Sequence, residues 1–165
     1  MLDGFNFDGD LHPLDAVEVF ASRKAWEFDR LSEDRIALTV EGLWRLYTLT
    51  LTWQPADETL RLLCTFEMNP PPARHPALFD LLNRANDSVW TGAFTYWPDQ
   101  RLMVWRYGLA LPGGLAVGAG QIEHLMQGAV AASERFYPAF QLVAWGDAAP
   151  DKALHIAIAE ACGRA

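Results

Sequence analysis

The sequence has few cysteines and few basic residues, and it contains no long hydrophobic run. Its two cysteines, Cys64 and Cys162, lie far apart, and such a pair is more often two ordinary thiols than a disulfide, although the spacing alone leaves their redox state open. No segment approaches the ~18 to 20 apolar residues that a membrane helix needs. The first residues have neither the positive charge nor the apolar region of a secretory signal. We therefore expect a cytoplasmic protein that does not bind a membrane.

The charge balance argues against nucleic acid as a partner. The chain has 13 basic and 21 acidic residues, a net charge of −8 and a pI of about 4.8. The basic residues are scattered, whereas nucleic-acid binding depends on clustered Lys and Arg that displace counterions from phosphate. The acidic balance favours solubility.

Patterns that indicate catalysis or a bound cofactor are also missing. No two of the histidines stand at metal-ligand spacing on one expected element; they are His12, His75, His124 and His155. The glycine-rich stretch 118–123 ends in Glu123 where a dinucleotide-binding loop needs its third glycine, so we interpret it as a flexible connector. Ser133 is not part of a nucleophile elbow. We expect no catalytic residues, no metal and no organic cofactor, and hence a protein that is not an enzyme.

The composition is that of a folded domain. Hydrophobic residues make up 51% of the 165 residues, which is too much for a disordered chain. Two Phe residues among Asp and Gly predict an N-terminal arm over residues 1–12, and the remainder, 13–165, reads as a single domain. Apolar residues at helical spacing predict helices over about 13–22, 76–87 and 150–162, and a long helix from about 121.

Period-two alternation marks the strands. Three successive segments, around 36–40, 47–53 and 60–66, have apolar residues on one face only, which is typical of an antiparallel meander with one solvated face; a further short strand is expected at 26–30. Two more strands, 90–97 and 101–111, form a hairpin around Pro98. In the long helix, Pro138 should cause a kink or a restart. The fold class predicted is α+β, with one antiparallel sheet and helices packed largely on one face.

This element order and several local motifs resemble the YbjN domain family, over nearly the whole chain from Pro13 to Gly163. The motifs that carry the resemblance are Asn86, Trp90-x-Gly92-x-Phe94, Arg106-Tyr107, Glu134 to Gln141 and Trp145-Gly146. They are most similar to an alphaproteobacterial branch. That branch usually has Ser-Pro-Glu at the starts of the long helix and the last helix, where this chain has Ala119-Gly120-Gln121 and Ala149-Pro150.

The resemblance implies a fold like that of type III secretion chaperones and a non-catalytic, protein-interacting domain, chaperone-like or regulatory, of the sensory transduction regulator type. The alternative is a small-molecule-binding or enzymatic domain with a pocket under the aromatic hairpin. Convergent buried polar groups in such a pocket would favour the alternative.

The strand after Pro98 is apolar on both faces, with Met103, Trp105 and Tyr107 on one and Leu102 and Val104 on the other. A strand of this kind is covered on both faces, either by helices of the same chain or by a partner, such as a second copy or an apolar segment of a client. Since chaperones of the resembled fold are commonly dimeric, we expect a homodimer. Its candidate contacts are Leu82, Trp97 and Trp105.

Overall fold

The structure, a computed structural model, describes residues 12–163, with side chains as far as residue 159. The predicted N-terminal arm therefore lies outside the described residues, apart from His12. The strands are β1 (Glu27–Ser32), β2 (Arg35–Glu41), β3 (Leu46–Gln54), β4 (Thr59–Glu67), β5 (Ala93–Trp97) and β6 (Leu102–Ala110). The helices are α1 (Pro13–Arg23), α2 (His75–Asp87), α3 (Ala119–Ala144) and α4 (Pro150–Gly163).

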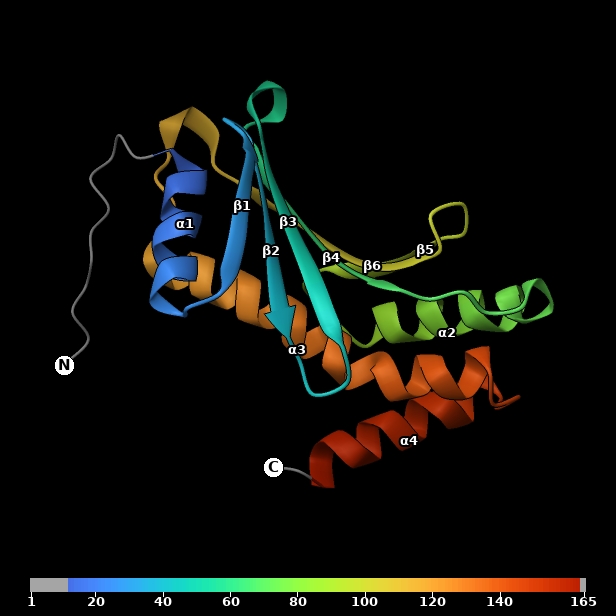
Figure 1. Cartoon of the computed structure of the whole chain (residues 1–165). Helices are drawn as coiled ribbons and strands as arrows, with labels where there is room; N and C mark the ends of the chain where they lie inside the picture. Colours follow the sequence, from blue (N-terminus) through green and yellow to red (C-terminus); the bar gives the residue numbers. More distant parts are fainter. Residues whose placement is uncertain (1–11, 164–165) are drawn as a thin grey trace.

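The six strands form one antiparallel sheet in the order β1-β2-β3-β4-β6-β5. The first four strands are a meander, and β5 and β6 are a hairpin whose second strand pairs with β4. This confirms the predicted α+β class, with one sheet built from a meander and a hairpin. Strand β5, which follows α2, forms the edge of the sheet. Strand β6 then lies between β5 and β4 (Figure 1).

The register places the apolar alternation of neighbouring strands on a common face. Leu49 is opposite Leu38 on one side and Cys64 on the other, and Cys64 is in turn opposite Trp105. All four side chains are buried. Because side chains alternate along each strand, this row and its neighbours two residues away form the floor of the core.

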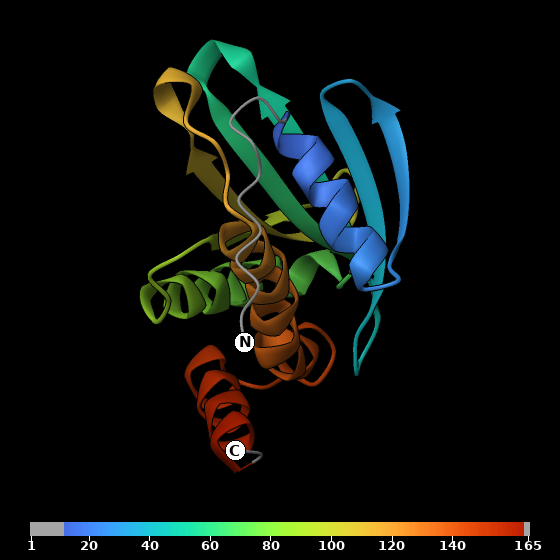
Figure 2. The same ribbon diagram turned by 90° about the vertical axis from the view of Figure 1, so that its left-hand side faces the viewer.

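Helices α1 and α3 both lie over this face of the sheet (Figure 2). The predicted stripe of α3 is the side that packs on the core: its buried members include Ile122, Met126, Phe136 and Phe140. The helix continues through Pro138 to Ala144, so it does not restart there. Tight packing on both sides of the proline stabilises this continuation, since Phe136 and Phe140 stack on each other and Phe94 contacts both edge-on.

The two remaining helices lie towards the other end of the molecule. Helix α2 packs against β5, α3 and α4, and α4 contacts α2 and α3 (Figure 1). The far side of the sheet has no helix over it in the part of the chain that the structure describes (Figure 1). Val104 faces that side and is buried although it is not part of the core cluster. Its neighbours in the register are Thr65 and Thr95.

Candidate functional site

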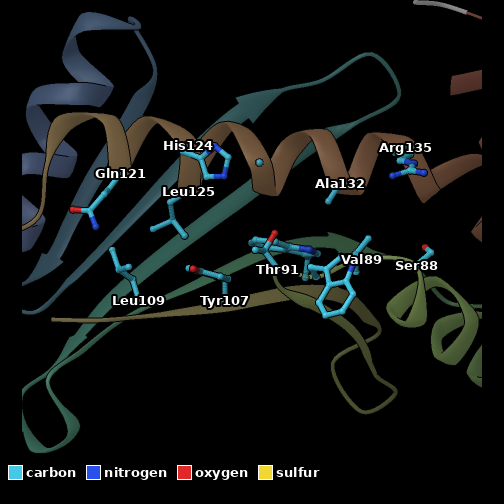
Figure 3. A pocket seen from close by; sticks show the side chains of 13 residues that line it. Ser88, Val89, Thr91, Tyr107, Leu109, Gln121, His124, Leu125, Ala132 and Arg135 are labelled. Carbon is cyan, nitrogen blue, oxygen red and sulfur yellow. The ribbon is translucent and has the colours of Figure 1, made fainter. Parts of the chain in front are cut away.

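A cavity of about 450 Å³ lies between α3 and β6, on the helix-covered face of the sheet (Figure 3). Three segments that are distant in sequence line it: one face of α3, the C-terminal half of β6, and the connection from α2 to β5. The lining side chains are Ser88, Val89, Trp90, Thr91, Trp105, Tyr107, Leu109, Gln121, His124, Leu125, Gly128, Ala132 and Arg135. The sequence-based alternative placed a pocket under the aromatic hairpin, and this cavity lies at that hairpin.

Small residues on α3 leave the space open. Gly128 and Ala132 stand one helical turn apart on the cavity side, while Ala129 and Ser133 face the core. A Cβ added at Gly128 would have no neighbouring atom within 4 Å. Glycine in a helix interior costs ~0.5 to 1 kcal/mol relative to alanine, and no close contact requires it at this position.

The opposite wall is aromatic. The rings of Trp105 and Tyr107 on β6 stack with centroids 6.0 Å apart and an interplanar angle of 11°. Trp105 is only 3% exposed, and its indole nitrogen Nε1 has no hydrogen-bond partner among the described residues. A buried N–H without an acceptor costs ~1 to 3 kcal/mol. This atom is therefore a donor that the chain itself leaves unpaired.

The connection from α2 to β5, which lines the cavity, is fixed by Asn86. This residue lies near the end of α2 and binds the backbone of Phe94 at the start of β5. The Asn86 side chain accepts a hydrogen bond from the backbone N–H of Phe94 (2.7 Å) and donates one to the Phe94 carbonyl (3.0 Å). Gly92 has φ +75°, and its backbone lies against the Trp105 indole so closely that a Cβ would overlap the ring. For this reason the strand begins at Ala93, and the prediction that it begins at residue 90 was wrong.

Two basic side chains, the imidazole of His124 and the guanidinium of Arg135, lie at the rim of the cavity. None of the lining residues is acidic. Both project from α3, with Arg135 towards the end where Ser88 lies and His124 nearer Tyr107 (Figure 3). Among the described residues no carboxylate pairs with Arg135, whose guanidinium lies 5.2 Å from the centroid of the Phe136 ring. In a chain with net charge −8, this is a local positive site.

A second feature is the β2–β3 hairpin loop, which is fixed on α3 by Glu134. The Glu134 carboxylate accepts hydrogen bonds from the backbone N–H groups of Leu43 (3.1 Å) and Trp44 (3.3 Å) and from the Tyr47 hydroxyl (2.6 Å). The Trp44 ring stacks on Tyr137, with centroids 6.1 Å apart. These contacts fix the β2–β3 hairpin loop to the C-terminal half of α3.

Gly42 makes this close approach possible. A Cβ at this position would overlap the Glu134 carboxylate and would lie 2.5 Å from the Tyr47 ring. Leu43 in the loop and Leu46, the first residue of β3, are nevertheless exposed to solvent over 71% and 63% of their surface. The fixed loop therefore presents apolar side chains that the described part of the chain does not cover.

Burial suppresses the reactivity of the thiol at the centre of the sheet. Cys64 is free and buried, and its Sγ lies 3.4 Å from the Ser133 hydroxyl, which donates to the Ala129 carbonyl. Burial raises the pKa of the Cys64 thiol to about 12. The side chain of Cys162 lies outside the described residues. Ser133 and Cys64 are thus core groups without an activating base.

The three predicted dimer contacts are not equivalent in the structure. Leu82 and Trp105 are both buried in the core of the single chain, so they offer little surface to a second copy. Trp97 is partly exposed at the β5 edge. Sequence alternation identified the two apolar faces of β6 correctly, but it could not tell that the chain's own helix covers one of them.

Two kinds of feature are absent from the part of the chain that the structure describes. No helix within residues 12–163 combines the length and apolar character required to cross a bilayer. Among the side chains that the structure describes, residues 12–159, no three of His, Cys, Asp or Glu are grouped as a metal site would need.

Comparison with known proteins decides the family. The profile of the YbjN family, described as "Putative bacterial sensory transduction regulator", matches residues 13–142. The chain belongs to the YbjN family. A search of curated proteins gave no match. The YbjN fold is also found among solved structures: "Crystal structure of YbjN, a putative transcription regulator from E. coli" is similar with a TM-score of 0.52 and 16% identity, over 72% of this chain and 84% of that one.

The structure explains several residues of the YbjN resemblance. Asn86 and Gly92 set the start of β5, and Glu134 and Tyr137 hold the hairpin loop. Gly146 packs on α3, where a Cβ would be 2.8 Å from the Leu142 carbonyl oxygen. Sequence analysis missed the roles of Glu134 and of the cavity residues. The signal available for the cavity was a glycine in the middle of a long helix.

Proposed function

We propose that this chain is a non-catalytic regulatory domain that acts by binding a protein partner through the β2–β3 hairpin loop. The observation that carries the proposal is a pair of exposed leucines, Leu43 in the loop and Leu46 at the start of β3, beside the backbone that Glu134 holds in place. Apolar side chains grouped on the surface mark interaction sites more often than scattered ones do.

The rigidity of the loop supports this proposal. A mobile loop loses conformational entropy when it binds, whereas a loop that is already fixed does not. The carboxylate of Glu134 accepts hydrogen bonds from two backbone N–H groups of the loop. The stacking of Trp44 on Tyr137 holds the loop against α3. The family description as a regulator agrees with a role in protein contact. A chaperone-like role would use the same surface to hold an apolar segment of a client.

The test is capture of partners from a lysate of the source cells by the intact protein and by a Leu43→Ser/Leu46→Ser variant. One partner should be recovered with the wild type and lost with the variant. The matched control is Leu115→Ser, because Leu115 is also an exposed loop leucine but lies in the connection before α3. A partner that both variants retain, or that both lose, would contradict the assignment to this loop.

Self-association is part of the proposal. The face of the sheet opposite the helices holds Trp97, Leu102 and Val104, and no helix of the described chain covers it. A two-fold dimer allows one such patch to cover itself. We assign the dimer contact to this face, where Trp97 is partly exposed on the edge strand β5.

A second candidate function is small-molecule binding. It is favoured by one specific observation: the unpaired N–H of Trp105 in the wall of a cavity of about 450 Å³. Ligand sites in proteins are concave, largely apolar, and contain a few polar groups that orient the ligand. Saturable binding of a small probe at this cavity is the corresponding measurement.

A further inference from the structure

We propose that the cavity between α3 and β6 binds a small amphipathic anion, with a flat apolar body and one anionic group. This inference rests on the second candidate function, small-molecule binding, and it is independent of the hairpin loop. The body would lie along the stacked rings of Trp105 and Tyr107, and the anionic group would meet Arg135.

The shape of the cavity supports a flat body. Its floor is a pair of nearly parallel aromatic rings, and Leu109 and Leu125 line its other end (Figure 3). Opposite the rings, α3 carries Gly128 and Ala132 instead of large side chains, so the helix leaves a slot. Flat apolar molecules stack favourably on Trp and Tyr rings in such a setting.

The polar groups select for negative charge. Arg135 and His124 line the cavity, Gln121, Ser88 and Thr91 add neutral polar groups, and no carboxylate lines it. The neighbouring carboxylates on α3 have partners elsewhere: Glu134 binds the hairpin loop and Glu123 pairs with Lys24 at 3.5 Å. A carboxylate, sulfonate or phosphate of a ligand would therefore meet donors without competing acids.

The unpaired donor in the wall is an independent sign of a missing acceptor. The Trp105 N–H is buried, and Gly92 shields it from solvent; a Cβ at Gly92 would lie 2.7 Å from this nitrogen. Buried polar groups in proteins are nearly always paired. A polar atom of the ligand, or a water that the ligand holds, would satisfy this N–H after a small shift of the connection 88–92.

Two fluorescent probes that share an aromatic frame test the proposal. The first is 1-anilinonaphthalene-8-sulfonate, which is anionic, and the second is N-phenyl-1-naphthylamine, which lacks the sulfonate. Each is titrated into the full-length wild type, and into Gly128→Leu, Gly120→Leu and Arg135→Gln. Gly120 is the matched control for Gly128, because it also lies on α3 with no atom within 4 Å of an added Cβ, but it does not line the cavity.

We expect saturable one-to-one binding of the sulfonate probe to the wild type and to Gly120→Leu. Gly128→Leu should weaken the binding of both probes by about tenfold or more, because the new side chain occupies the space of the ligand body. Arg135→Gln should weaken only the sulfonate probe, by about tenfold, since it removes a charged hydrogen bond. Circular dichroism checks that each variant is folded, and Arg135→Gln, a change at an exposed residue, keeps the test decisive if Gly128→Leu does not fold.

The position of the probe is read from the indole N–H resonance of Trp105, assigned by its loss in Trp105→Phe. This resonance should shift on binding. If neither probe binds, or if binding is the same in Gly128→Leu as in Gly120→Leu, or if the resonance does not move, then small-molecule binding at this cavity is wrong. If both probes bind in the cavity equally well and Arg135→Gln changes neither, small-molecule binding stands and the anionic class is overturned.

Discussion

The Tyr47 hydroxyl donates a hydrogen bond of 2.6 Å to the carboxylate of Glu134 and so joins the third strand of the meander to the middle of α3. Tyr47 is completely buried, while Glu134 is half-buried and also binds the backbone of the hairpin loop. Burial, with the hydrogen bond and charge of Glu134 as further causes, raises the pKa of Tyr47 well above its usual range. The pair is therefore a structural link in which the phenol keeps its proton.

Removing this link should destabilise the protein. Glu134→Ala leaves the buried Tyr47 hydroxyl without its acceptor, and we expect the free energy of unfolding to fall by ~1.5 to 3 kcal/mol, the range for a hydrogen bond to a charged group. Urea unfolding of Glu134→Ala, Tyr47→Phe and the double variant measures the coupling between the two residues. The control is Glu123→Ala, which removes an exposed ion pair with Lys24 and should have little effect. Additive effects of Glu134→Ala and Tyr47→Phe would contradict the link.

Gly92→Ala tests the contact between the α2–β5 connection and the cavity wall. The new Cβ would overlap the Trp105 ring, and the backbone has φ +75°, so we expect a loss of about 2 kcal/mol or more. Gly113→Ala is the matched control, because Gly113 has φ +65° but no atom within 4 Å of an added Cβ. Both variants lose stability through the positive φ, so the difference between their free energies of unfolding, measured by heat or urea, gives the cost of the overlap with the Trp105 ring. Equal losses would show that the indole moves aside without cost, and would contradict a tight contact.

Trp97 and Trp105 should respond differently to a negative charge. Trp105→Glu places a carboxylate in the core and should unfold the protein, whereas Trp97→Glu changes a partly exposed side chain and should leave a folded chain. Sedimentation should then show a dimeric wild type and a monomeric Trp97→Glu. A wild type that is monomeric at tens of micromolar would refute the dimer. A folded Trp105→Glu would refute its assignment to the core.

The Cys64 thiol should be inert in the native protein. In a Cys162→Ser variant, Ellman's reagent at pH 8 should react with Cys64 only after unfolding, because the thiol is buried and its pKa is raised to about 12. The folded state holds this proton more tightly than the unfolded chain, whose thiol pKa is about 8.5. This contribution to stability is therefore complete below about pH 8.5 and is lost as the pH rises towards 12. Native Cys64 that reacts at the rate of the unfolded chain would contradict its burial.

The sequence was sufficient for the elements of this fold but not for all of their contacts. Alternating residues such as Leu49 and Leu51 predicted the strands because an antiparallel sheet with one solvated face requires period two. The stripe on α3 was predicted correctly for the corresponding reason, at period 3.6. Alternation does not say which strand fills the place beside β4, since pairing is decided by contacts between segments far apart in the chain.

The candidate site depended on such long-range contacts. No pattern within β6 indicates that Gly128 and Tyr107 will line the same cavity, or that Gly92 will lie on the Trp105 ring. The same limit explains why Trp105 was expected at a partner surface: its face of the strand was identified as apolar, but the cover came from a helix that begins after the strand has ended. Glu134, too, was quoted only as part of a motif, because its partners are in the β2–β3 hairpin.

The strand order has a consequence for how the chain folds. The pairings of β1 with β2, β2 with β3, and β3 with β4 each join neighbours in sequence, so each closes only a short loop. The pairing of β4 with β6 must close across α2 and β5, and longer loops cost more entropy to close. We therefore expect the meander to form ahead of the rest during synthesis, and the docking of β6 on β4 to be the slow step of folding. Until it docks, β4 is an unprotected edge, so a nascent chain is most exposed to aggregation at the strand that later forms the centre of the sheet.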